Sequence, residues 1–244
     1  MTTQQKVAFI TGANRGIGLE TALQLGKQGV RVIAGSRDRA SGEAMLKSLA
    51  THGVEADLLN FDVNRREDHL SAFDYIQKNY GRLDILVNNA GILRDADNGT
   101  ASTTPQNVLR ETFDANFFNL VALTQTLLPL IRLSNAGRIV NLSSSLGSLA
   151  QHSDPTSPIY GSWRFAYNSS KTALNAFTVH LAQELKDTPI KVNSAHPGWV
   201  KTDMGGEGAM LDVEDGARTS VQLALLPESG PTGGYFHLDK ALPW

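Results

Sequence analysis

Short apolar runs alternate with longer amphipathic segments along the whole chain. The apolar runs predict strands at residues 7–10, 30–34, 58–63, 83–87, 139–142, 190–195 and 235–238. Apolar positions three and four residues apart predict helices at about 16–29, 40–50, 67–80, 105–133 and 167–185. Because such alternation is typical of a parallel sheet, we expect a doubly wound α/β fold of about seven parallel strands with helices on both faces.

Three segments fit neither pattern, and we expect them to be irregular. They are residues 94–104, residues 148–166 and the glycine-rich stretch 205–209. Long loops in compact domains tend to carry function or to move. No repeat or linker divides the chain, so residues 1–244 are predicted to form a single domain.

The first predicted strand and helix are joined by a glycine-rich turn, Thr11-Gly12-Ala13-Asn14-Arg15-Gly16-Ile17-Gly18. Glycines let a pyrophosphate approach the backbone and the helix N-terminus, where amide groups and the helix dipole favour an anion. The spacing differs from the common GxGxxG, and glycine also serves such turns for steric reasons alone. Between a strand and a helix, we interpret the turn as the dinucleotide site of a Rossmann-type domain.

The residues after the second strand bear on which dinucleotide binds. An acidic residue there usually holds the ribose hydroxyls of NAD. This chain has Ser36-Arg37-Asp38. Ser36 and Arg37, helped by Arg15, are predicted to hold the 2′-phosphate of NADP(H). Two alternatives stay open: Arg37 is an ordinary solvated charge, or a register one residue different makes Asp38 a ribose ligand.

Composition narrows the class of protein. The 22 basic and 24 acidic residues nearly balance, so charge gives no case for nucleic acid or an acidic membrane surface. The absence of cysteine excludes disulfides, zinc–thiolate sites and a cysteine nucleophile. The N-terminus has no signal-peptide pattern and no apolar run is long enough to span a bilayer, so we expect a cytoplasmic enzyme. The histidines show no ligand spacing, and no metal is predicted.

Tyr167 and Lys171 lie four residues apart and share one face of a predicted helix. A nearby ammonium favours the phenolate, so Lys171 is predicted to lower the pKa of Tyr167 and to fit it for proton transfer. Tyr160 and Arg164 have a similar spacing, so the pair gains weight only from its agreement with other motifs.

From about Lys6 to its end, the chain resembles the short-chain dehydrogenase/reductase family, in particular its carbonyl reductase branch. The landmarks appear in the family's order: residues 11–18, Asp62-Val63, Asn88-Asn89-Ala90-Gly91, Asn116, the serines after Asn141, Tyr167 to Lys171, and Pro197-Gly198. The segments Pro197 to Met204 and Leu223 to Pro227, with the closing Gly-Tyr-Phe, carry the likeness to carbonyl reductases.

The resemblance implies a catalytic role for four residues. Tyr167 would be the general acid, and Lys171 would bind the nicotinamide ribose and tune the tyrosine. Among Ser143, Ser144 and Ser145, the family pattern of a serine, two residues and a glycine selects Ser144, which would hold the substrate oxygen. Asn116 would support a water chain to Lys171. Its place on an apolar stripe leaves a purely structural role open, in which neighbouring backbone satisfies its amide.

The resemblance also implies cofactor and substrate contacts. Asp62 and Val63 would contact the adenine, and Asn89 would contact the adenosine ribose. Thr202 would contact the cofactor near its pyrophosphate and carboxamide. The remaining cofactor contacts would come from Gly12, Asn14, Arg15, Gly16, Ile17, Gly18, Ala90, Gly91, Pro197, Gly198 and Val200. Trp199 and Met204 are expected as apolar walls of the substrate pocket. His196 is not assigned a catalytic role, because Tyr167 already supplies the proton.

These features predict NADPH-dependent reduction of a ketone, aldehyde or quinone, with the substrate site in the C-terminal half. The alternatives are an NAD-dependent alcohol dehydrogenase and a non-catalytic nucleotide sensor; the intact serine, tyrosine and lysine argue against the sensor.

The serine-to-tyrosine gap is longer than in most relatives, and the extra residues 151–165 contain three aromatics. We expect this insertion to cover the helical surface on which relatives associate, giving a monomer, or to act as a lid over the pocket.

Overall fold

The computed structural model describes residues 5–95 and 99–244, and within them the strands form one sheet. The strands are β1 (Val7–Ile10), β2 (Arg31–Ser36), β3 (Ala56–Asn60), β4 (Ile85–Asn88), β5 (Arg138–Leu142), β6 (Lys191–Ala195), β7 (Tyr235–His237) and β8 (Lys240–Ala241). Their order is β3-β2-β1-β4-β5-β6-β7-β8, and all neighbours pair in parallel except β7 and β8. The predicted doubly wound α/β fold is confirmed, with the short antiparallel β8 added at one edge.

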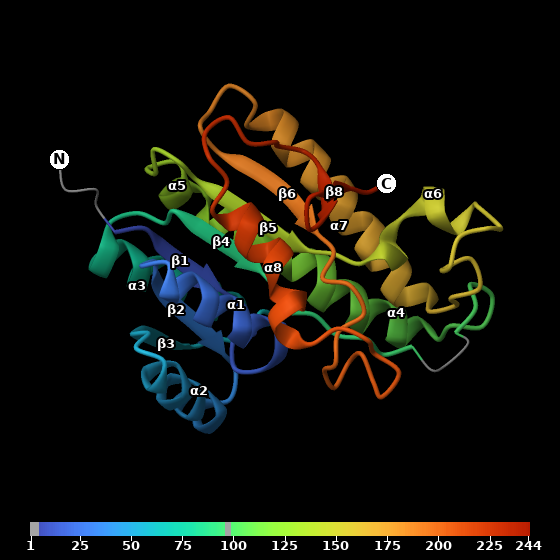
Figure 1. Ribbon diagram of the computed structural model, residues 1–244, viewed down its shortest axis with the longest axis horizontal. Helices are drawn as coiled ribbons and strands as arrows, with labels where there is room; N and C mark the ends of the chain where they lie inside the picture. The colour runs from blue at the N-terminus through green and yellow to red at the C-terminus, as the bar shows by residue number, and fades with distance from the viewer. Residues whose placement is uncertain (1–4, 96–98) are drawn as a thin grey trace.

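Helices cover both faces of this sheet (Figure 1). They are α1 (Gly16–Lys27), α2 (Arg39–Thr51), α3 (Arg66–Tyr80), α4 (Gln106–Phe113), α5 (Asn119–Ile131), α6 (Leu149–His152), α7 (Phe165–Glu184) and α8 (Val213–Ala224). Strand β1 shows why both faces are apolar. Val7 and Phe9 pack towards α3, α5 and α7, whereas Ala8 and Ile10 pack towards α1, α2 and α8. Alternate side chains of a strand point to opposite faces, so this all-apolar strand fits burial on both.

The strand order reverses between β1 and β4, and ligands of open α/β sheets bind at such a point, beyond the carboxyl ends of the strands. The glycine turn follows β1, Asn89 follows β4, the serine run follows β5, and His196 follows β6. Topology therefore brings the motifs from distant parts of the sequence to one edge of the sheet.

Two helices differ from their predicted form. The predicted helix over residues 105–133 is divided into α4 and α5 by a π-helical turn, Asp114–Phe118. Helix α8 was not predicted, although its buried residues recur at helical spacing, because most of them are small or weakly apolar and do not form a conspicuous apolar stripe. These are Gly216, Ala217, Thr219, Ser220, Leu223 and Ala224. Gly216 allows the close contact, since a Cβ there would lie 2.6 Å from a methyl group of Val200.

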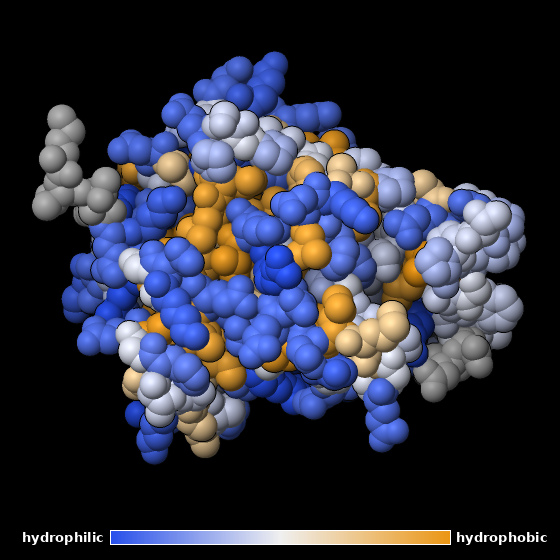
Figure 2. All heavy atoms as spheres, viewed as in Figure 1, coloured by the Kyte–Doolittle hydropathy of each residue, from blue (hydrophilic) through white to orange (hydrophobic). Residues whose placement is uncertain are grey.

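The segments expected to be irregular contain little regular structure. The short helix α6 lies within 148–166, directly after a 3₁₀ turn at Ser145–Gly147. Within 94–104, residues 96–98 lie outside the described part of the chain. The third strand ends at Asn60, before the predicted limit at 63. The surface seen in Figure 2 is mainly polar, with apolar side chains in small groups. Among the described helices, none combines the length and apolar character needed to cross a bilayer.

Candidate active site

The glycine turn has a shape that side chains would disturb. Gly12 and Gly16 have φ angles of +62° and +54°, which favour glycine. A Cβ at Gly18 would lie 2.3 Å from the Gly12 carbonyl oxygen, so the start of α1 packs directly on the turn. The first turn of α1 has neither an acidic residue nor a side-chain cap. Its amide groups are therefore available to an anion, as the pyrophosphate hypothesis requires.

Asn89 and Thr11 fasten this turn to the end of β4. The Asn89 side-chain amide donates to the carbonyl oxygens of Thr11 and Gly12, at 2.8 and 3.0 Å. The Thr11 hydroxyl accepts from the backbone N–H groups of Asn89 and Ala90, at 3.0 and 2.9 Å. Asn89, predicted to bind the adenosine ribose, thus has a structural task that its sequence position did not reveal.

The residues after β2 bear on the two cofactor hypotheses. The Asp38 carboxylate accepts from the backbone N–H of Ser41 at 2.8 Å and caps α2, and this bond lowers the pKa of Asp38. The buried Ser36 hydroxyl donates to the Asp38 carbonyl at 2.8 Å, so the backbone already engages it. Arg37 is exposed and has no ionic or hydrogen-bonded side-chain partner among the described residues. Of the two charges, Arg37 is thus the one left available to a ligand.

The segment after β6 lies over the glycine turn. A Cβ at Gly16 would lie 3.3 Å from the Thr202 methyl group, and Arg15 forms an exposed ion pair with Asp203. Gly198, with φ +86°, turns the chain where a Cβ would lie 2.3 Å from a Leu211 methyl group. Thr202 and Asp203 therefore contact the turn that is predicted to hold the pyrophosphate.

Other predicted contacts occupy the same edge of the sheet. Asn14 donates to the Ser41 hydroxyl at 3.2 Å, which links the glycine turn to the start of α2. Asp62 and Val63 follow β3, where the Asp62 carboxylate accepts from the backbone N–H of Asn64 and the Val63 carbonyl contacts the His69 ring at 2.8 Å. The Asp62 side chain thus shapes its own turn.

Helix α7 presents Tyr167 from a firmly capped N-terminus. Both oxygens of the buried Asp95 carboxylate accept backbone N–H groups, from Ala166 at 2.8 Å and from Tyr167 at 2.9 Å. A carboxylate also suits the positive end of the helix dipole. Sequence reasoning missed Asp95 because it lies far from α7 in the chain.

Tyr167 and Lys171 are buried together, and burial governs both pKa values. The Lys171 ammonium group lies 5.6 Å from the Tyr167 ring centre and donates to the Leu142 carbonyl at 2.7 Å. Burial lowers the pKa of Lys171 to about 8. Burial also raises the pKa of Tyr167 to about 12, against a smaller lowering by its hydrogen bond with Ser144. The prediction that Tyr167 has a lowered pKa beside Lys171 is therefore wrong, because burial outweighs the contacts that lower it.

The three neighbouring serines have different partners. The buried Ser143 hydroxyl donates to the Asn175 side chain at 2.7 Å, and the Ser145 backbone N–H donates to His196 Nδ1 at 3.1 Å. The Ser144 hydroxyl accepts from the Leu146 backbone N–H at 3.2 Å, and of the three serines it is the one that lowers the pKa of Tyr167. Gly147 lets this turn approach α7, since a Cβ there would lie 2.9 Å from the Lys171 backbone. This contact explains why a glycine follows Ser144 by three residues.

Asn116 lies in the π-helical turn and is fully buried. Its amide nitrogen donates to the Ile92 carbonyl at 2.9 Å and the Ser170 hydroxyl at 3.0 Å, and its oxygen accepts from the Ile92 N–H at 2.8 Å. Gly91 separates Asn116 from Lys171: a Cβ there would lie 3.2 Å from the Asn116 oxygen and 3.6 Å from the Lys171 nitrogen. The backbone thus satisfies the amide, as the structural alternative expects. The predicted water relay stays a prediction.

His196 supports the serine turn. Its ring stands 5.1 Å from the ring of His237, and His237 Nδ1 contacts the His196 carbonyl at 3.0 Å. Burial, and then the nearby His237, lower the pKa of His196 to about 3, so the neutral ring keeps Nδ1 as an acceptor for the Ser145 N–H. The sequence gave no sign of this contact between His196 and the serine turn.

The predicted pocket walls lie on the segment after β6. Trp199 is half-exposed, donates from its ring nitrogen to the Gly205 carbonyl at 2.8 Å and covers Gly208. Met204 is also half-exposed, whereas Val200 is buried and pairs with Leu211. Neither Trp199 nor Met204 is a core residue, so both remain available to a ligand.

Over residues 5–95 and 99–244, histidine, aspartate and glutamate nowhere gather in a group of three that would suit a metal ion.

Fold and site together define a doubly wound α/β protein of the dinucleotide-binding class. The short chain dehydrogenase family matches residues 6–209. The chain belongs to this family and is an oxidoreductase.

Comparison with known proteins shows the same likeness over nearly the whole chain. Bovine carbonyl reductase [NADPH] 1 is 32% identical over 283 aligned positions, which include 100% of both proteins. The structure of salutaridine reductase from Papaver somniferum has a TM-score of 0.82 and 28% identity, covering 95% of this chain and 99% of that one. The actinorhodin polyketide ketoreductase structure with NADPH has a TM-score of 0.83 and 28% identity, covering 96% of each chain.

Proposed function

We propose that this protein uses NADPH to reduce a ketone, aldehyde or quinone to the alcohol, within one domain that spans residues 1–244. The observation that carries the proposal is the meeting of Ser144, Tyr167 and Lys171 beside the glycine turn, at the carboxyl edge of the sheet. The similarity to bovine carbonyl reductase [NADPH] 1 and to the ketoreductase structure with NADPH supports the choice of cofactor.

The proposed reaction divides the work between cofactor and protein. The reduced nicotinamide supplies a hydride to the carbonyl carbon. Tyr167 donates its phenolic proton to the carbonyl oxygen, and a pKa raised to about 12 keeps that proton in place at neutral pH. The Ser144 hydroxyl donates a hydrogen bond to the same oxygen, where negative charge develops in the transition state. A proton from solvent then restores the phenol.

Lys171 and Arg37 are the basic residues that would bind the cofactor. The Lys171 ammonium group, within reach of the Tyr167 ring, would hold the nicotinamide ribose. Arg37 would bind the 2′-phosphate, because it is exposed at the end of β2 while the Asp38 carboxylate caps α2. The Ser36 hydroxyl already donates to the Asp38 carbonyl, so Ser36 would contact the 2′-phosphate through its backbone.

A substrate panel tests the proposal. The full chain is mixed with NADPH and, in turn, with ketones, aldehydes and quinones of increasing size, and the loss of NADPH absorbance is followed. Turnover of at least one carbonyl class supports a reductase. NADPH binding without turnover of any class would support a nucleotide sensor, and turnover with NADH alone would support an NAD-dependent enzyme.

A further inference from the structure

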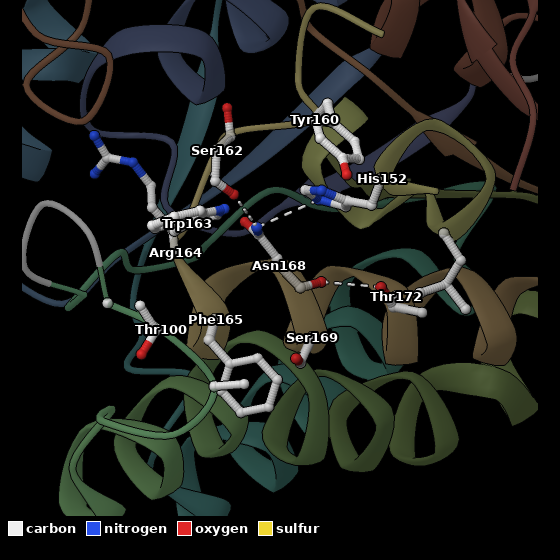
Figure 3. Close-up of a pocket in the computed structure, with 13 residues that line it drawn as sticks. Thr100, His152, Tyr160, Ser162, Trp163, Arg164, Phe165, Asn168, Ser169 and Thr172 are labelled. Carbon is white, nitrogen blue, oxygen red and sulfur yellow. Dashed lines mark hydrogen bonds between the residues drawn. The ribbon is translucent and has the colours of Figure 1, made fainter. Parts of the chain in front are cut away.

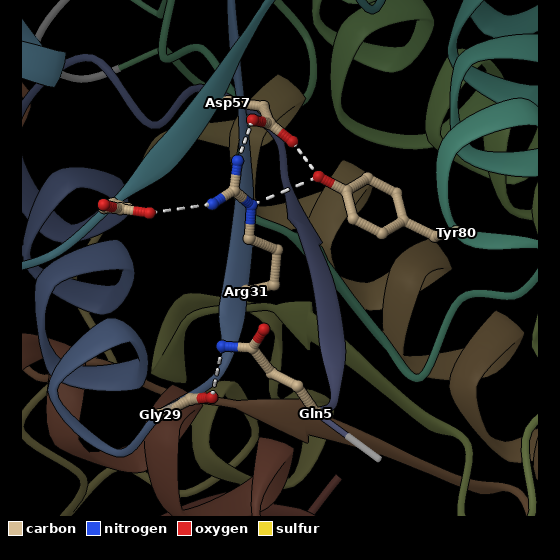
Figure 4. A network of polar contacts seen from close by, with 6 residues as sticks. Gln5, Gly29, Arg31, Asp57 and Tyr80 are labelled. Carbon is tan, nitrogen blue, oxygen red and sulfur yellow. Dashed lines mark hydrogen bonds and ion pairs between the residues drawn. The ribbon is translucent and has the colours of Figure 1, made fainter.

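A second hollow lies on the outer side of α7 (Figure 3). Its volume is about 470 Å³, a size typical of small-molecule pockets. Three segments of the described chain line it: residues 99–101, the stretch from α6 to Phe165, and the first turns of α7. The predicted insertion therefore rests on α7 without filling the space above it.

This pocket is separate from the proposed hydride-transfer site. Successive residues of an α-helix are about 100° apart, so Asn168 and Thr172 point about 100° away from Tyr167 and Lys171 around α7. Asn168 and Thr172 line the pocket, whereas Ser144, Tyr167 and Lys171 do not. A molecule in this pocket would thus contact a different side of α7 from the one that carries Tyr167 and Lys171.

The rim of the pocket exposes large apolar side chains. Tyr160 is 50% exposed, Trp163 57% and Leu149 62%, and all three line the same hollow. Large apolar groups that gather around a concave surface often mark a ligand site. The two aromatic rings suit a flat partner, because stacked or edge-to-face rings attract beyond the area that they bury.

Asn168 adds a polar group at the base of the pocket. Its amide nitrogen donates to the Ser162 carbonyl at 2.9 Å, which fixes the orientation of the side chain. Its amide oxygen is shielded from solvent and accepts no hydrogen bond within the described chain. Such an acceptor is costly when unpaired, and a ligand donor would pair with it if the side chain turned this oxygen towards the hollow.

We propose that this pocket is a second small-molecule site, which binds a planar aromatic compound carrying a hydroxyl group. The aromatic body would contact Tyr160 and Trp163, and the hydroxyl would donate to the Asn168 oxygen. This inference does not depend on the proposed reaction, because none of the residues assigned to that reaction lines the pocket.

Calorimetric titration of the full chain with 2-naphthol tests the site. Trp163→Ala should weaken binding about tenfold or more, since it removes a ring contact and its buried area. Leu133→Ala is the control, because Leu133 is comparably exposed, at 63% against 57% for Trp163, and does not line the pocket. Undiminished binding by Trp163→Ala, or an equal loss in Leu133→Ala, would overturn the proposal.

The role of Asn168 is tested with a second probe. 2-Methoxynaphthalene has the same ring system but no donor, and it should bind the wild type about 2- to 10-fold more weakly than 2-naphthol. The difference should disappear in Asn168→Leu. Equal affinity of the two probes for the wild type would refute the hydrogen bond to Asn168. This comparison uses only the wild-type protein, so it does not depend on whether a variant folds.

Discussion

The residues after β2 bear on the choice of cofactor, because the two candidate ligands have different partners. The Asp38 carboxylate caps α2, whereas Arg37 is exposed. The sequence alone left both possibilities open, because a one-residue change of register exchanges the roles of Arg37 and Asp38. The hydrogen bond from Ser41 to Asp38 favours Arg37 as the cofactor ligand.

Arg37→Ala should weaken NADPH binding by about 10- to 150-fold and barely change NADH binding. The reason is that a hydrogen bond to a charged partner contributes about 1.5–3 kcal/mol, and NADH lacks the 2′-phosphate. Titration of wild type and variant with each cofactor measures the effect. An equal loss for NADPH and NADH would show that Arg37 does not bind the phosphate.

His196 should act through the serine turn. His196→Phe leaves the Ser145 N–H without its acceptor, and an unpaired buried donor costs about 1–3 kcal/mol. We expect kcat to fall about tenfold while NADPH affinity changes little. His196→Asn, which retains a nearby acceptor, should recover most of the activity. Equal activity of both variants would contradict the positioning role.

At the scale of elements, the sequence predicted the sheet well because its central strands are apolar on both faces. It failed where small residues or distant partners determine the structure. The buried face of α8 has helical spacing but is built mostly from small residues, and the cap of α7 comes from Asp95, far away in sequence. Motif spacing predicted Tyr167, Lys171 and Ser144 as a group, but the pKa of Tyr167 depends on burial, which spacing does not encode.

The junction of β1 and α1 should not tolerate a side chain at Gly18. Gly18→Ala places a methyl group 2.3 Å from the Gly12 carbonyl oxygen unless the turn shifts. We expect at least a tenfold loss of NADPH affinity, and a free energy of unfolding lower by about 1–3 kcal/mol. Denaturant melts and NADPH titration measure both. Gly161→Ala is the control, since a Cβ at Gly161 meets nothing within 4 Å; equal behaviour of the two variants would refute close packing of the turn.

At the scale of the whole molecule, the segment before α7 is the feature that bears on assembly. It packs over the outer side of α7, where the Ser162 carbonyl accepts from Asn168, and Tyr160 and Trp163 remain about half-exposed at its surface. We predict a monomer, because this segment covers the helical surface on which relatives are expected to associate. Sedimentation equilibrium at micromolar concentration should give the mass of one chain. A dimer or tetramer mass would refute the blocking role.

The central claim, that Tyr167 is the proton donor of an NADPH-dependent reductase, is tested most directly by single-turnover and steady-state kinetics of Tyr167→Phe. The Tyr167 ring is buried beside Lys171. The substitution removes only the hydroxyl group and keeps the packing of the ring. We predict normal folding, NADPH affinity near that of the wild type, and kcat reduced at least 100-fold, the usual scale of general acid catalysis. Tyr160→Phe should retain nearly full activity. A Tyr167→Phe enzyme that keeps more than about a tenth of the wild-type kcat, a loss below about 1.4 kcal/mol in the activation barrier, would contradict the account.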